Sequence, residues 1–394
     1  MTAVAAVDPG RAERAALVAL ASLTGIGPAT LLALHTEGAL GAWDALRAGK
    51  GRNVGALAQE ADRRSDARLI DKLERSAAAI EPEAVLARHE ADGQRVLALG
   101  DDDYPARIRG DQAPPAVLFA RGDLARLAGP SVAIVGTRNA TQLGRVTAAA
   151  LAVELAERGI SVVSGLALGI DAAAHEPLVA RSTGGGPIGV VATGLERAYP
   201  RRHELLHRQV AARGVLISES PMGSEPSRWR FPARNRIIAT IAHAVVVVES
   251  RSTGGSMLTA SEAVARDRPV LAVPGHPTAA AAAGTLDLIC DGAMPVRDVA
   301  DVLVAMGLGG LPAADPIAAV EPAPRVGDRA ARVLQELDAN PKTLGELVLA
   351  GAGDLESASA ALTELEQAGL VVRSGAWFER AGGVLAPTGT GRDR

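Results

Sequence analysis

The sequence predicts an α/β protein in which a doubly wound parallel sheet is flanked by an N-terminal helical domain and a C-terminal winged-helix domain. Six short apolar runs rich in β-branched residues follow one another between residues 131 and 275. The segments between them are long enough for crossover helices, the pattern of a parallel sheet buried on both faces. Such a sheet binds ligands beyond the carboxyl ends of its strands. The predicted parts are residues 1–85, helical; 95–305, sheet domain; 306–327, linker; and 328–385, winged helix.

The N-terminal part has apolar residues at helical spacing and no β-branched runs over residues 11–80, which predicts several short helices. Within it, LTGIGPATLLAL (residues 23–34) places Gly-Ile-Gly in a tight turn between two helices. This resembles a helix-hairpin-helix element, whose backbone amides can face a phosphate. One such hairpin can equally be a packing turn.

The central part has the six predicted strands. They are residues 131–136, 161–165, 188–193, 214–219, 244–249 and 270–275, with crossover helices expected at 144–159 and 256–267.

The linker is rich in Pro, Ala and Gly, and the residues after it predict three helices and a hairpin, typical of a winged helix. The predicted helices are residues 329–337, 343–351 and 356–369, and the hairpin is 370–382. The third helix carries Glu356, Glu364 and Glu366 and no Lys or Arg before residue 370. Because proteins that read duplex DNA place a basic helix in the major groove, we expect this domain to contact another protein or to make a self-contact.

Composition excludes several classes of protein. The chain has 394 residues, 48% of them hydrophobic, and a net charge of −4, so attraction to nucleic acid must come from a local patch. A single cysteine, Cys290, excludes an internal disulfide framework and a cysteine-rich zinc site. We see neither a signal peptide nor a membrane-spanning run, so we expect a soluble, cytoplasmic protein without membrane contact.

Two segments match catalytic motifs, but neither match is specific enough to predict an enzyme. HELLH (residues 203–207) matches a zinc-protease motif, with Glu219 or Glu225 as a conceivable third ligand, but we interpret it as a surface helix. Ser164, Asp171 and His175 suggest a hydrolase triad, but Ser164 lacks a nucleophile elbow, and we expect Asp171 to pair with His175.

Three glycine-containing turns follow predicted strands: GTRNATQLG (136–144), SGLALG (164–169) and STGGS (252–256). Arg138 stands where a dinucleotide fingerprint has its second glycine, so the first turn disfavours a pyrophosphate, but its guanidinium can reach a phosphate. Each turn can open a helix whose first amides favour an anion, or can serve only as a tight turn.

The segment SRWRFPARNR (227–236) is the most informative. It holds four arginines interleaved with Trp229 and Phe231, in a chain with three Trp, two Tyr and three Phe in all. Arginine binds phosphate and a planar ring stacks on an unstacked base, so this segment predicts single-stranded nucleic acid binding. The alternative is a solvated loop with Phe231 in the core.

Seven motifs stand in the order found in the DNA-processing protein A family, also called DprA or Smf. They are VAIVGTRNATQLG, VVSGLALGIDAAAH, TGLERAYP, ISESPMG, FPARNRIIA, VVVVES and LAVPG. In this resemblance YPRRHELLH is similar to the family's YP-x-x-N-x-x-L segment, with His203 in the asparagine position, so the zinc match is accidental. Gly254 departs from the family's usual Ser.

The resemblance implies an extended Rossmann fold. It also implies a homodimer that binds single-stranded DNA and loads RecA recombinase onto DNA taken up in natural transformation. It implies no cofactor, metal or catalytic residue. Carried over by motif, the DNA-binding residues would be Gly136, Arg138, Ser164, Gly165, Arg228, Phe231, Arg234, Asn235 and Arg236.

An enzyme of another class is an alternative function for this chain, and a zinc metalloprotease is a more remote one. Nucleoside-monophosphate phosphoribohydrolases, related to cytokinin-activating proteins, share a similar core with a Gly-Gly loop, and Glu262 could then act as their acid.

Overall fold

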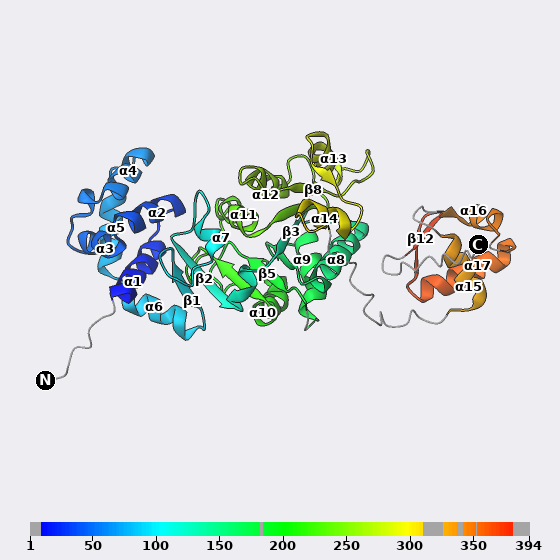
Figure 1. Ribbon diagram of the computed structural model, residues 1–394, viewed down its shortest axis with the longest axis horizontal. Coiled ribbons are helices and arrows are strands. Elements are labelled where there is room, and N and C mark those ends of the chain that lie inside the picture. Colours follow the sequence, from blue (N-terminus) through cyan, green and yellow to red (C-terminus); the bar gives the residue numbers. More distant parts are fainter. Residues whose placement is uncertain (1–8, 182–183, 310–325, 338–341, 352, 381–394) are drawn as a thin grey trace. The chain divides into compact units, whose positions relative to one another are not determined.

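The chain consists of two compact units, Met1–Pro312 and Ala313–Arg394, each with its own hydrophobic core. The computed structural model describes residues 9–181, 184–309, 326–337, 342–351 and 353–380 (Figure 1). Most of the predicted linker and the end of the predicted winged helix lie outside the described residues.

A nine-stranded sheet in the order β1-β2-β6-β5-β4-β3-β7-β8-β9 is the centre of the first unit. All six predicted strands are confirmed within a few residues, and they pair in parallel. They are β3 (Ser131–Val135), β4 (Ser161–Ser164), β5 (Pro187–Val190), β6 (Val215–Ser218), β7 (Ala244–Val247) and β8 (Val270–Ala272), to which β9 (Met294–Pro295) adds a short parallel edge.

The other edge of the sheet adds antiparallel strands to the predicted parallel arrangement. There β1 (Arg95–Ala98) and β2 (Val117–Gly122) pair antiparallel, and β2 pairs antiparallel with β6. The connection between β1 and β2 holds only the one-turn helix α7 (Ala106–Arg109), which is too short to cross the sheet and return in parallel.

Helices cover both faces of the sheet because the strands are apolar on both sides. Val132 and Ile134 of β3 pack with α8 (Gln142–Glu157) and α9 (Ile170–Val179), while Ala133 and Val135 pack with α11 (Arg230–Ile241). The remaining covering helices are α10 (Glu204–Arg213), α12 (Gly255–Val264), α13 (Ala283–Cys290) and α14 (Val299–Ala305).

After β3 the chain passes to one face of the sheet. After β7, the strand beside β3, it passes to the opposite face. The helix after β3 is α8 and the helix after β7 is α12, and these two belong to different apolar clusters. Loops that diverge from neighbouring strands leave a crevice at the carboxyl ends of those strands. The topology therefore provides a place for a ligand where the sequence predicts one.

The predicted N-terminal helices are present and share a hydrophobic core with the antiparallel edge of the sheet. Leu17 and Leu20 belong to one buried cluster with Val117 and Phe119 of β2, and the His89 ring stacks on Phe119 at 4.4 Å. Figure 1 shows these helices, in blue, beside β1 and β2. They are α1 (Pro9–Ser22), α2 (Pro28–Glu37), α3 (Ala39–Arg47), α4 (Gly55–Arg64), α5 (Leu69–Ala78) and α6 (Pro82–Ala91).

The second unit has the predicted three helices and hairpin around a core that includes Val333, Leu347, Leu362 and Phe378. A two-residue strand joins the hairpin in a three-stranded sheet of order β10-β12-β11. The winged-helix interpretation stays a prediction. The elements are α15 (Asp328–Glu336), β10 (Lys342–Thr343), α16 (Leu344–Leu349), α17 (Leu355–Gln367), β11 (Val371–Ser374) and β12 (Trp377–Arg380).

None of the helices that the structure describes has the length and apolarity to cross a membrane.

His175, buried on α9, makes folding sensitive to acid. Its Nε2 donates to the Val162 carbonyl at 3.1 Å, its Nδ1 has no partner among the described residues, and burial lowers its pKa from 6.5 to about 4. Between those pH values the unfolded chain binds a proton that the folded chain does not, so stability falls as the pH falls, by about 3 kcal/mol over the window.

We therefore expect His175→Gln to flatten the pH dependence of the free energy of unfolding between pH 6.5 and 4 by close to one proton. Urea denaturation of both proteins across this window measures it. An unchanged pH dependence in the variant would contradict the assignment.

Candidate nucleic-acid interface

A pocket of about 650 Å³ opens at the carboxyl ends of β3 and β7, in the crevice that the topology creates. Segments that are distant in sequence form its walls: the turn after β3, the turn from β4 into α9, Tyr199 before α10, the turn after β7 and the start of α11. Four arginines line it, namely Arg138, Arg228, Arg234 and Arg251. Asp171 is the single carboxylate among the described lining residues, so the pocket favours an anion.

Two aromatic rings and a guanidinium meet at one wall of this pocket. The Arg138 guanidinium lies over the Phe231 ring, 5.3 Å from its centroid, and the Tyr199 ring lies 5.5 Å from the same ring. Phe231 is half-buried and Tyr199 is 41% exposed. Phe231 is therefore a wall of the pocket, and the alternative that it belongs to the core is wrong. A ring that contacts a cation and a second, tilted ring is fixed in place and can serve as a platform on which a base stacks.

Arg234 forms the floor of the pocket and is 6% exposed. Its Nη1 donates to the Val190 carbonyl of β5, and burial lowers its pKa to about 10, opposed by the charge of Asp171. The guanidinium lies against the backbone of Gly165, where a β-carbon would come within 2.0 Å of Nη1. A glycine is required there because any side chain would displace the arginine. Because the lowered pKa of Arg234 still lies well above 7, this arginine stays charged at neutral pH.

Asp171, in the first turn of α9, is held by backbone amides and does not pair with His175. Its Oδ2 accepts hydrogen bonds from Gly165 N at 3.1 Å and Ala167 N at 3.3 Å, whereas His175 bonds to Val162. The expected Asp171–His175 pair is wrong because the turn before α9 offers the carboxylate two amides, and the imidazole points to β4. Ser164 is fully buried and donates to Ile134 O at 2.7 Å, so these three residues form no triad.

The structure brings six of the nine residues predicted to bind DNA into the lining of this pocket: Gly136, Arg138, Arg228, Phe231, Arg234 and Asn235. The other three lie behind it. Ser164 and Gly165 are buried beneath the lining, and Arg236 forms a buried ion pair with Glu219 and donates to Ala113 O at 2.9 Å. These three residues therefore do not face the pocket, and their predicted role in DNA binding stays a prediction.

Sequence reasoning missed several lining residues. Arg251, Thr253, Gly254 and Ser256 come from the turn after β7, and Tyr199 comes from the segment before α10. The signal for Thr253, Gly254 and Ser256 was present, since they belong to the glycine turn STGGS (252–256) that follows a predicted strand, and Arg251 directly precedes this turn. Tyr199 has no such signal, because its place beside Phe231 depends on a long loop.

The HELLH segment forms no metal site in the structure. His203 ends the short helix η3 (Arg201–His203) and its Nδ1 donates to Leu166 O at 3.1 Å, while His207 lies within α10. His207 is 6% exposed, so its interpretation as a surface residue is wrong. Glu219, one conceivable ligand, pairs with Arg236 instead. Across the described parts of the chain, no group of three His, Cys, Asp or Glu residues could hold a metal ion.

Glu262, the acid that a phosphoribohydrolase would need, lies on α12 and forms an ion pair with Arg266. It is absent from the described lining of the pocket. The acid that this enzyme alternative assigned is therefore not in the pocket.

Comparison with known proteins agrees with this architecture. The family model of DNA recombination-mediator protein A matches residues 95–307. DNA processing protein DprA of Bacillus subtilis is 37% identical over 219 residues, covering 55% of this chain and 73% of that protein. Protein Smf of Synechocystis is 35% identical over 301 residues, covering 75% of this chain and 73% of that protein.

A solved structure extends the agreement to the fold. The X-ray structure of DNA processing protein A from Streptococcus pneumoniae superposes with a TM-score of 0.59 at 29% identity, over 73% of this chain and 95% of that chain. The chain therefore belongs to the DNA recombination-mediator protein A family, as its seven ordered motifs predict.

Proposed function

We propose that this chain binds single-stranded DNA in the pocket at the carboxyl ends of β3 and β7. The observation that carries the proposal is the Arg138–Phe231–Tyr199 cluster beside three further arginines in one concave site. Guanidinium groups bind phosphates of any sequence, and the ring stacks on any base. The same cluster gives no reason to propose a catalytic reaction, a metal or a cofactor.

A single strand fits this chemistry better than a duplex. In a duplex each base is stacked on its neighbours, so only an unstacked base can stack on the face of the Phe231 ring. Duplex recognition instead uses a helix or ribbon that projects into a groove, whereas here the ring lies inside a concavity.

The name of the family supports a role for this chain in recombination. We propose that the bound strand is handed to RecA recombinase and that this takes place in the cytoplasm, on DNA taken up in natural transformation or on other recombination substrates. The acidic outer face of α17 supports a protein partner for the second unit, since Glu356 and Glu364 are exposed on it.

We also propose that the chain is a homodimer. Apolar side chains are exposed on the edge strand β9, where Met294 is 39% exposed, and on α12, which packs against the neighbouring strand β8 and whose Val264 is 64% exposed. An edge strand flanked by exposed apolar side chains is suited to an interface between two copies.

Removal of one phosphate contact should change the salt dependence of binding. For a single strand each contact adds about 0.7 to the slope of log K against log salt, so Arg138→Ala and Arg228→Ala should each flatten the slope by about that amount for every sequence. Fluorescence anisotropy across a salt series measures it. The matched control is Arg213→Ala, an exposed arginine that ends α10 at the amino end of β6. Equal slopes in all four proteins would contradict the pocket.

Removal of the ring should act differently. Phe231→Ala should weaken single-strand binding by about 1 to 3 kcal/mol and leave the slope almost unchanged, because stacking releases no counterions. Phe231→Tyr, which keeps the ring, should bind as the parent does. Melting temperatures recorded beside the affinities separate loss of stacking from loss of folding. A loss of affinity that only follows a loss of stability would overturn the role of the ring.

A further inference from the structure

A second groove, of about 940 Å³, lies between the N-terminal helices and the loop that precedes α11. One wall is the Gly-Ile-Gly turn between α1 and α2, together with Arg63 and Arg64 at the end of α4. The other wall is the loop after β6 with Trp229 and Arg230. The turn that resembles a helix-hairpin-helix element thus faces a cavity.

The pocket and the groove share one wall, which is four consecutive residues long. Arg228 and Phe231 line the pocket at β3 and β7, while Trp229 and Arg230 line the groove. A polymer that leaves the pocket over the start of α11 therefore enters the groove without crossing another element.

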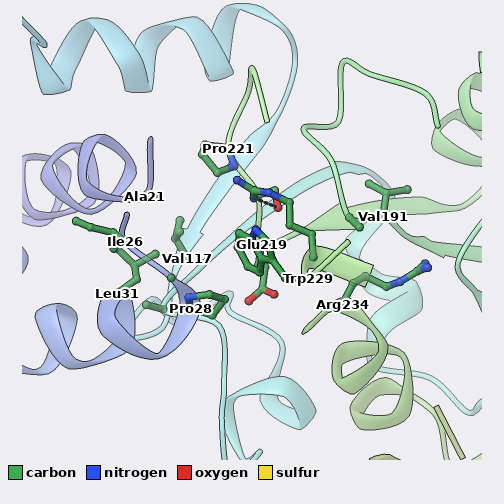
Figure 2. A pocket seen from close by; sticks show the side chains of 15 residues that line it. Ala21, Ile26, Pro28, Leu31, Val117, Val191, Glu219, Pro221, Trp229 and Arg234 are labelled. Carbon is green, nitrogen blue, oxygen red and sulfur yellow. Dashed lines mark hydrogen bonds between the residues drawn. The ribbon is translucent and has the colours of Figure 1, made fainter. Parts of the chain in front are cut away.

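The groove repeats the chemistry of the pocket. Trp229 is 51% exposed, and the Arg230 guanidinium lies over its ring at 4.7 Å, as Arg138 lies over Phe231. Figure 2 shows the cavity beside this ring, with Ile26, Pro28 and Leu31 on one side and Trp229 and the Glu219 carboxylate on the other. A half-exposed indole paired with a guanidinium is a second stacking platform.

Charge in the groove also favours a phosphate backbone. Arg63 and Arg64 share the carboxylate of Glu60, so this cluster keeps one net positive charge, and the Arg63 side chain is 69% exposed. Arg230 donates to Ser220 Oγ at 2.7 Å, which fixes it on this wall. Against three arginines the described lining has one carboxylate, Glu225, which lies 3.9 Å from Arg197.

We infer that the groove holds the continuation of the same DNA strand, with a base on Trp229 and phosphates beside Arg63, Arg64 and Arg230. This inference rests on the proposed function of the first pocket. It predicts a binding site longer than the pocket and a direct role for the N-terminal helices in holding DNA.

Gly27 provides a test that preserves folding. It is the N-cap of α2, with φ −94° and ψ 173°, it lines the groove, and a β-carbon there would meet nothing within 4 Å. Asp and Asn are both preferred N-cap residues, so Gly27→Asp and Gly27→Asn should both fold. Only the aspartate places a negative charge against a phosphate backbone.

The experiment compares single-stranded oligonucleotides of about 6 and about 20 nucleotides, within and beyond the length that one binding module covers. The parent should bind the longer one more tightly. Gly27→Asp should lower affinity for the longer oligonucleotide and not for the shorter, Gly27→Asn should match the parent, and Trp229→Ala should weaken only the longer complex, on the order of 5- to 100-fold.

Variants that bind both lengths as the parent does would overturn the inference, as would an equal loss at both lengths. Failure of the parent to bind the shorter oligonucleotide would instead contradict the first pocket, so the two proposals fail in different ways.

Discussion

The site depends on the packing of one buried cation, the Arg234 guanidinium, against the backbone of Gly165. A buried charge is stable only when polar groups compensate it, and here the Val190 carbonyl and the nearby Asp171 do so. Asp171 is itself fixed by the amides of Gly165 and Ala167. One arginine thereby joins β5, the turn after β4 and the first turn of α9 to α11.

This arrangement positions the residues that face the ligand. Phe231 lies one helical turn before Arg234 on α11, so anchoring the arginine fixes where the ring stands. Phe231 in turn supports Arg138 from the turn after β3. Because the ring and the guanidinium that lies over it both depend on the start of α11, the packing of this helix fixes the platform, and a fixed platform lowers the entropy cost of binding.

Much of this could be predicted from the sequence, for physical reasons. Strands buried on both faces must be apolar throughout, so β3 to β8 are visible as continuous runs. Arginines interleaved with rings in a chain poor in aromatics identified Phe231 and its neighbours. The family motifs added Gly136 and Asn235, which line the same pocket.

Other features depend on contacts that no local pattern encodes. Four residues of β1 give no sign that they lie antiparallel at an edge, and the connection to β2 contains no helix long enough for a parallel crossover. Arg236 is in the same cationic segment as Arg234 but lies two residues further along the helix, so it faces Glu219 and not the pocket. His207 resembles a surface residue in sequence, yet the packing of α10 buries it.

The proposed binding of single-stranded DNA by a chain with net charge −4 relies on a local pocket of arginines and a ring. It is tested by the affinity of the whole protein for single-stranded and duplex DNA of one sequence at about 50 and about 200 mM salt. We expect tighter binding of the single strand at both concentrations, because stacking persists when salt weakens the phosphate contacts. Equal or tighter binding of the duplex would contradict it.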